Sequence, residues 1–303
     1  MSTSITKSSP LAIPAYILRG ISQIFFVNNA ASGLLIAVAM ATVHPLSGVL
    51  VVLGSAVQSL GAWALGYKEE IVQGLMGYNG ALVGAAASFA LEDIKTAILM
   101  TVVGSFACVP VHLLVAKLFA TKPLGWAALP VSTAPFCAVA GMMVGIIYPM
   151  IENDKPTSTT HLLSGLGLGF FNNFSEVVLS DTLLTGALII VALFIGSPGI
   201  ALFGMLGSAV QLLEIFVTPF SITQVSAGIL GYSAVLVSIA IGAVFWADKS
   251  WVWRIGGAVV GVLCTLVLQP LLMLTPIPVY TWPFLLSMWL VLLAGGALSK
   301  RAR

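Results

Sequence analysis

Apolar residues dominate the chain in ten long stretches, which Gly, Pro or charged residues separate. A helix needs about 20 consecutive apolar residues to cross the hydrocarbon core of a membrane. The pattern therefore predicts ten spans: 30–44, 47–66, 72–91, 97–119 and 130–150, then 183–196, 199–218, 224–246, 253–274 and 282–299. Two further stretches, 19–28 and 164–179, are too short or too broken to cross.

Composition identifies the solvent around these stretches. Of the 303 residues, 59% are hydrophobic and 7% are charged, whereas a soluble domain carries roughly 25% charged residues. We therefore expect an all-α integral membrane protein in contact with membrane lipid. The net charge of +2 gives no indication of a nucleic-acid partner.

The basic residues predict an orientation. With the N-terminus in the cytoplasm, ten of the twelve fall on the cytoplasmic side, and only Lys95 and Lys155 fall outside. Cytoplasmic loops of membrane proteins carry such an excess of Lys and Arg. Ten crossings with both termini inside follow from this count.

Four internal matches occur in the same order in both halves. GSAVQ at 54–58 recurs at 207–211, and 23–33 lies over 176–186, both at an offset of 153. GLMGYNGALV (74–83) matches GILGYSAVLV (228–237) at 154, and LPVSTAPF (129–136) matches IPVYTWPF (277–284) at 148. A nearly constant offset indicates a duplication.

Five spans in each copy would invert the second copy relative to the first. In inverted repeats the substrate site lies at the repeat interface, near discontinuous helices in matching positions. The expected organisation is a cytoplasmic segment 1–18, a first repeat 19–150, an extracytoplasmic linker 151–163, an inverted repeat 164–299 and a basic tail 300–303.

Glu176 is an ionisable residue in an apolar setting, FFNNFSEVVLS, and Gln23 is its repeat mate. Carboxylates at membrane depth usually face a cavity or a partner. An amide and a carboxyl in symmetric places favour a shared hydrogen-bonding role over charge transfer. The alternative is a structural hydrogen bond that holds a broken helix.

Two further polar pairs follow the repeat. Asp181 and Asn28 each precede an apolar run, which is typical of helix N-caps, with contact to a solute as the alternative. Thr133 and Thr281 each lie two residues before a proline. The threonines could form a narrow polar constriction or could cap and back-bond their own helices, and the pattern does not choose.

The remaining candidates are weaker. Tyr78 with Leu82, and Tyr232 with Leu236, each share a helix face that pattern alone assigns more readily to packing. Glu214 breaks the repeat near a span end, which favours an interfacial or subunit-contact role. Motifs of nucleophilic, metal or nucleotide chemistry are lacking, so the sequence predicts no enzyme, no metal site and no cofactor.

QIFFVNN, GLMGYNGALVG, LPVSTAPF and TWPF together resemble the urea transporter family over nearly the whole chain. The resemblance implies two inverted halves, each with five spans and a tilted half-helix, a homotrimer, and one urea pore per subunit. It implies that Gln23 and Glu176 flank flat apolar slots and that Thr133 and Thr281 lie between them. The implied slot walls are Ile24, Phe26, Tyr78 and Leu82 in one half and Val177, Leu179, Tyr232 and Leu236 in the other.

Two departures concern the second half. Leu179 stands where the first half has Phe26, and Ser233 stands where it has Asn79. The first affects the geometry of the inner slot, and the second affects local backbone packing.

The leading hypothesis is passive urea flow through a plasma membrane, the inner membrane in a Gram-negative cell. The only basic residues in the predicted spans, Lys117 and Arg254, lie at the span ends, and the spans carry no coupled acidic relay, which favours downhill flow. The alternatives are a pore for ammonia, water or short amides, and a transporter in which Glu176 carries a proton.

Overall fold

A computed structural model describes residues 12–147, 161–218, 220–276 and 278–301, and every regular element within them is a helix. The elements before residue 148 are α1 (Ile13–Ser22), η2 (Gln23–Phe25), α2 (Ala30–Ala41), α3 (Pro45–Ala64), α4 (Lys68–Val72), α5 (Tyr78–Ala90), α6 (Ile94–Phe119), η3 (Gly125–Ala127) and α7 (Ala134–Ile147). Those after residue 160 are α8 (Leu162–Ser175), η4 (Glu176–Val178), α9 (Leu183–Gly196), α10 (Pro198–Gln211), η5 (Leu212–Phe216), α11 (Ile222–Ser226), α12 (Tyr232–Ile239), η6 (Ala240–Phe245), α13 (Trp251–Met273) and α14 (Trp282–Arg301). Most of the predicted linker 151–163 lies outside the described residues, and α1 begins inside the segment predicted to precede the first repeat.

The two short stretches form broken helices. α1 with η2 meets α2 at a bend of 74°, and α8 with η4 meets α9 at a bend of 77°. Each bend has a non-glycine residue in the left-handed region, Phe26 with φ 61° and Leu179 with φ 60°. The expected discontinuities therefore occur, at matching positions of the two halves.

The helix caps after these bends lie one residue later than predicted. Asn29 and Thr182 cap α2 and α9, because each has extended backbone and accepts a hydrogen bond from the third residue of its helix. The prediction of Asn28 and Asp181 as caps is therefore wrong. A cap must have the geometry that lets its side chain reach the free N–H groups of the first turn.

Two predicted spans are interrupted. The stretch 72–91 contains the end of α4, a turn and α5, and the stretch 224–246 contains part of α11, a turn, α12 and η6. Gly74 and Gly228 allow these turns, since they have φ of 78° and 80°. Glycine adopts this region at little cost, so the helices restart in new directions at α5 and α12.

Corresponding residues of the two halves make the same contacts. Ser55 Oγ donates to Ile17 O at 2.8 Å, and its mate Ser208 Oγ donates to Phe170 O at 2.9 Å. A Cβ on Gly33 would lie 1.8 Å from Leu18 O, and one on Gly186 would lie 2.1 Å from Phe171 O. The duplication seen in the sequence therefore extends to packing within each half.

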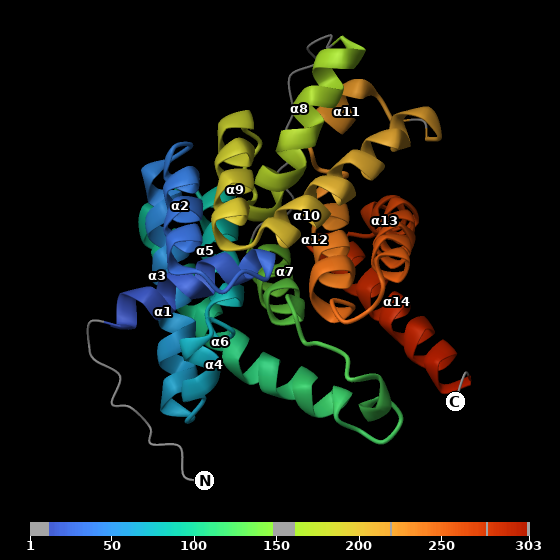
Figure 1. The fold of residues 1–303 in the computed structure, drawn as a ribbon. Coiled ribbons are helices and arrows are strands. Elements are labelled where there is room, and N and C mark those ends of the chain that lie inside the picture. The colour runs from blue at the N-terminus through green and yellow to red at the C-terminus, as the bar shows by residue number, and fades with distance from the viewer. Residues whose placement is uncertain (1–11, 148–160, 219, 277, 302–303) are drawn as a thin grey trace.

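The halves meet along α2 and α9, with α7 and α14 also in contact (Figure 1). Ser32 Oγ donates to Ala192 O at 2.7 Å, and Thr185 Oγ1 donates to Ala39 O at 3.2 Å. At the offset of 153, Ser32 corresponds to Thr185 and Ala39 to Ala192. The contact is therefore reciprocal, and α2 and α9 run antiparallel.

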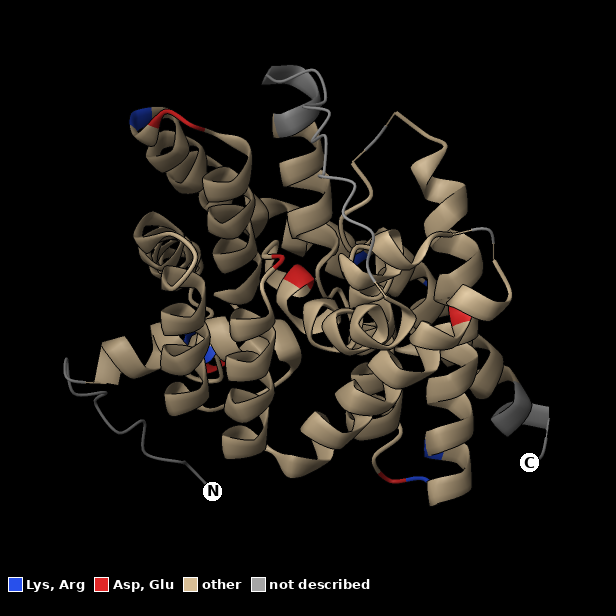
Figure 2. Cartoon of the chain, turned by 90° about the horizontal axis from the view of Figure 1, so that it is seen from above, with Lys and Arg blue, Asp and Glu red and all other residues tan. Residues whose placement is uncertain are grey.

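The outer helices expose apolar side chains. Within the described residues, four helices are long and apolar enough to cross a membrane, or up to six if each bent pair is one span. The most apolar window of α6 is only 28% buried, and that of α13 is 33% buried. Charged positions are sparse along the ribbon (Figure 2). Large exposed apolar surfaces of this kind require lipid around them.

Asp93 is the N-cap of α6. Its carboxylate accepts from the side chain and the backbone N–H of Thr96, and these bonds lower its pKa below the ordinary value of 3.8. A lowered pKa means that the stabilisation is present above pH 3.8 and is lost as pH falls through the folded-state pKa. We expect Asp93→Ala to lower the melting temperature at pH 7, with the difference from the native protein shrinking below pH 3.8.

Asp93→Asn is the matched control, because asparagine caps helices as well as aspartate does but does not titrate. Melting curves in detergent across pH measure both variants. A deficit of Asp93→Ala that stays constant with pH would contradict the role of the charged cap.

Candidate functional site

Two threonines from the two halves meet in the interior. Thr133 Oγ1 and Thr281 Oγ1 lie 2.7 Å apart, and their residues are 3% and 2% exposed. The two hydroxyls hydrogen-bond to each other, which the capping interpretation does not require. One polar contact between corresponding residues therefore joins the starts of α7 and α14.

The backbone before each threonine has an unusual conformation. Ser132 and Tyr280 have φ of 49° and 36°, in the left-handed region. Such a conformation costs a non-glycine residue roughly 1–3 kcal/mol, so the surrounding structure must hold it. Pro135 and Pro283 follow in the first helical turn, where a missing N–H costs nothing.

Tyr78 and Asn79 hold the segment before Thr133. The carbonyl of Ser132 accepts from Tyr78 Oη at 2.9 Å and from Asn79 Nδ2 at 3.2 Å. Asn79 Oδ1 also accepts from the N–H of Phe136 at 3.0 Å, in the first turn of α7. Asn79 therefore binds the chain on both sides of Thr133.

Tyr232 makes the corresponding bond before Thr281. Its hydroxyl donates to the carbonyl of Tyr280 and lies 3.4 Å from Gln269 Nε2, which donates to it. Among the described residues, no hydrogen bond of Ser233 to this segment matches those of Asn79. With Ser233 in place of asparagine, the second half therefore lacks the two hydrogen bonds by which Asn79 holds the chain on both sides of Thr133.

Cys137 was not singled out by the sequence. Its Sγ lies 3.0 Å from Thr281 Oγ1, and its side chain is 1% exposed. Cys137 follows Thr133 by one helical turn, so the i, i+4 spacing in α7 was the available signal. Its repeat mate is Leu285, and the polar contact therefore has sulfur on one side only.

The predicted slot residues belong to one hydrophobic core or pack against it. Phe26 packs edge-on against Phe245 and Phe284 of the other half, with ring centroids 6.1 Å apart in each pair. Leu179 packs against the same core. Ile24, Leu82, Val177 and Leu236 are each 1–2% exposed, so they contact protein rather than solvent in this conformation.

Gln23 and Glu176, which were predicted to flank the slots, follow directly after α1 and α8 and are half-buried. Gln23 Nε2 donates to Gln73 O at 2.9 Å, which ties η2 to the turn after α4. Glu176 lies within electrostatic range of the Tyr232 hydroxyl, and η4 packs on both α12 and α5. Gln23 is therefore held by the turn that precedes α5, and the segment that carries Glu176 contacts both α5 and α12.

Glu214 is not at an interface as predicted. It is 1% exposed, and its Oε2 accepts from Gln211 Nε2 at 2.6 Å. The first half has Gly61 at this position and therefore lacks the carboxylate. Gln211 supplies one oxygen with the donor that a buried carboxyl group needs, while Oε1 is buried without a hydrogen-bond partner among the described residues.

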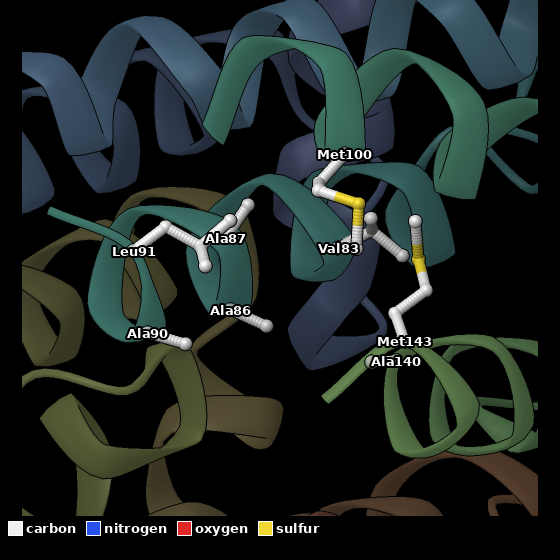
Figure 3. A pocket seen from close by; sticks show the side chains of 8 residues that line it. All are labelled: Val83, Ala86, Ala87, Ala90, Leu91, Met100, Ala140 and Met143. Carbon is white, nitrogen blue, oxygen red and sulfur yellow. The ribbon is translucent and has the colours of Figure 1, made fainter. Parts of the chain in front are cut away.

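A small pocket opens between α5, α6 and α7 (Figure 3). All of its lining side chains are apolar, and none is a predicted site residue: Val83, Ala86, Ala87, Ala90, Leu91, Met100, Ala140 and Met143. In the second half, Ile241, Val244 and Phe245 replace Ala87, Ala90 and Leu91. The pocket is therefore not a second polar site. Among the described residues, no group of three or more His, Cys, Asp or Glu side chains could hold a metal ion.

Comparison with known proteins extends over nearly the whole chain. Residues 15–296 match the family model described as "Urea transporter". The chain belongs to the urea transporter family. Relatives include Urea transporter 1 of Ovis aries, 26% identical over 313 residues that cover 95% of this chain and 78% of the relative. Urea transporter 1 of Rattus norvegicus is 27% identical over 301 residues, which cover 92% and 76%.

Membership confirms the resemblance carried by QIFFVNN, GLMGYNGALVG, LPVSTAPF and TWPF. It also confirms that this urea transporter family member is a membrane transporter and not an enzyme. Three of the four motifs contribute to the contact between Thr133 and Thr281: two carry the threonines, and GLMGYNGALVG carries Tyr78 and Asn79.

Proposed function

We propose that this chain conducts urea passively through a narrow uncharged passage between its two halves. The observation that carries the proposal is the hydrogen bond between Thr133 and Thr281 at 2.7 Å. It brings hydroxyls of both halves to one point inside an apolar core. A polar contact at a repeat interface is where a transporter of this architecture binds its substrate.

The proposed architecture has ten spans in two inverted repeats, 19–150 and 164–299, with a half-helix in each. The reciprocal bonds between antiparallel α2 and α9 support the inversion. They exchange the roles of corresponding residues, as a two-fold axis across those helices would. The proposed linker 151–163 is extracytoplasmic, and the segments 1–18 and 300–303 are cytoplasmic, as the basic residues indicate.

The proposed passage uses twelve side chains. Gln23 and Glu176 flank its ends and Thr133 and Thr281 form its centre, with walls from Ile24, Phe26, Tyr78, Leu82, Val177, Leu179, Tyr232 and Leu236. Gln23 donates one of its two amide N–H groups to Gln73 O, and its amide oxygen can accept a hydrogen bond from a solute. Both ends would then offer acceptor oxygens to the N–H groups of urea.

The chemistry of urea fits such a passage. Urea is planar and neutral, with four N–H donors and one strong acceptor. Apolar walls select a flat solute, while hydroxyl and carbonyl oxygens replace the water that it sheds, as backbone oxygens do in ion filters. Hydroxyls both donate and accept, so the threonine pair can serve either end of the molecule.

The chain is proposed to act in the plasma membrane, in the inner membrane if the cell is Gram-negative, as a homotrimer with one passage per subunit. The exposed apolar faces of α6 and α13 support contact with lipid or with neighbouring subunits. Mass measurement of the detergent-solubilised protein tests the trimer independently of transport.

The test of the function is urea flux into proteoliposomes that contain the purified chain. We expect saturable urea entry without sodium, with the same rate before and after a protonophore collapses the proton gradient. Thiourea and ammonia in the same assay measure selectivity. Liposomes with protein that admit urea no faster than empty ones would contradict the proposal.

Glu176→Gln separates passive flow from proton coupling. We expect a severalfold slower flux at low urea concentration, because a neutral amide accepts a weaker hydrogen bond than a carboxylate does. The independence from the proton gradient should persist. Glu69→Gln, which neutralises an exposed carboxylate on α4, is the matched control. Urea accumulation driven by a pH gradient in the native protein, and lost in Glu176→Gln, would indicate the proton-coupled alternative.

A further inference from the structure

We propose that Tyr78 and Tyr232 are positioning residues whose hydroxyl groups hold the two threonines together. This inference rests on the proposed function and assigns these hydroxyls a task other than lining a slot. Both side chains are 8% exposed. Their hydroxyls bond backbone carbonyls, of Ser132 in the first half and of Tyr280 in the second.

The bonded carbonyls belong to the residues directly before Thr133 and Thr281. Those residues have φ of 49° and 36°, a conformation that side-chain-bearing residues rarely adopt unaided. The backbone angles of a residue with positive φ set the direction of the chain that follows it. A hydroxyl bond to its carbonyl therefore fixes where the next side chain, the threonine, points.

The direction of each tyrosine proton follows from its partners. A carbonyl oxygen only accepts, so Tyr78 must donate to Ser132 and Tyr232 must donate to Tyr280. Gln269 Nε2 approaches Tyr232 Oη at 3.4 Å as a second donor, which leaves the tyrosine proton for the carbonyl. Neither bond leaves the hydroxyl proton to face a passing solute.

The two clamps differ in strength. Asn79 adds two bonds in the first half, to the carbonyl of Ser132 and from the N–H of Phe136. Among the described residues, the second half lacks the equivalent bonds. Removal of the Tyr232 hydroxyl therefore leaves Thr281 less well held than removal of the Tyr78 hydroxyl leaves Thr133.

Tyr78→Phe and Tyr232→Phe test the clamp, since they keep the rings and remove only the hydroxyls. One neutral hydrogen bond corresponds to a change of roughly two- to tenfold in an equilibrium or rate. We expect urea permeability to fall within that range for each variant, and further for Tyr232→Phe than for Tyr78→Phe. Tyr67→Phe, which removes a hydroxyl that makes none of these contacts, should leave permeability unchanged.

A double-mutant cycle shows whether the tyrosines act through the threonines. In a protein that carries both Thr133→Val and Thr281→Val, either tyrosine change should have no further effect on permeability. A merely structural role would multiply its loss in both backgrounds. The permeability ratio of urea to thiourea is measured as well, because it does not depend on how much protein is active, and it should shift in the tyrosine variants only where the threonines are present.

The outcomes separate the two proposals. If the native chain conducts no urea, the proposed function fails. If it conducts and the threonine variants are impaired while both tyrosine variants match the native protein, only the clamp fails. The clamp is also overturned if losses multiply in the valine background, or if permeability does not respond to the valine substitutions.

Discussion

Replacement of both central threonines by valine, Thr133→Val with Thr281→Val, should reduce urea permeability by roughly 10- to 100-fold. Valine nearly keeps the shape of threonine but presents a methyl group where the two hydroxyls now bond at 2.7 Å. A solute polar group left unpaired there costs about 1–3 kcal/mol, and 1.36 kcal/mol corresponds to a factor of ten in rate. Stopped-flow light scattering of proteoliposomes measures the rate.

The single variants should each lose less than the double variant, because the remaining hydroxyl can still donate or accept. Thr101→Val is the matched control, since Thr101 is a fully buried threonine that bonds the carbonyl of Ala97 within α6. Native permeability in the double variant would show that solute does not pass the threonine pair, and the proposed passage would be wrong.

Periodicity and repetition predicted the helices, the broken stretches and the duplication, because each depends on local sequence. The interruptions within two of the spans were missed, because hydropathy does not register a turn of the backbone. Hydropathy treats 72–91 as continuous, but Gly74 has a positive φ that turns the chain before α5 begins. The caps at Asn29 and Thr182 depend on backbone angles that composition does not encode.

The contacts of the candidate site could not be predicted from the sequence. Pattern alone left the threonines undecided, because the partner of Thr133 lies 148 residues away. Cys137 was overlooked because its partner Thr281 lies 144 residues away. The role of Tyr78 could not be inferred either, since its hydroxyl bonds a backbone carbonyl and leaves no sequence pattern.

Glu214 shows the opposite error. Its position near a span end suggested an interface, whereas the structure buries it beside Gln211. The amide that donates to this carboxyl group belongs to Gln211, which is the last residue of the repeated GSAVQ string and the repeat mate of Gln58. Where the first half has Gly61, the second half therefore places a carboxyl group beside a glutamine that both halves contain. A comparison of Gly61 with Glu214 alone does not reveal this partner.

Alanine in place of Gly33 or Gly186 should prevent correct folding of the bent pairs on which the proposed passage depends. A Cβ at these positions would lie 1.8 Å from Leu18 O and 2.1 Å from Phe171 O. The obstacle is backbone, so no side-chain rotation relieves it and the two helices must separate. We expect a loss of stability at or above the upper end of the roughly 1–3 kcal/mol typical of overpacking. Yield of monodisperse protein and its thermal midpoint in detergent measure this.

Gly256→Ala provides the control for the intrinsic preference of alanine for helices. Gly256 lies in α13, and a Cβ added there would have no neighbouring atom within 4 Å, so the change should be neutral or stabilising by about 0.5–1 kcal/mol. The opposite signs follow from one difference, the presence of a second backbone against the glycine. If Gly33→Ala and Gly186→Ala were as stable as Gly256→Ala, the close approach of α1 to α2 and of α8 to α9 would be wrong. The geometry that carries Gln23 and Glu176 to the ends of the passage would then lose its basis.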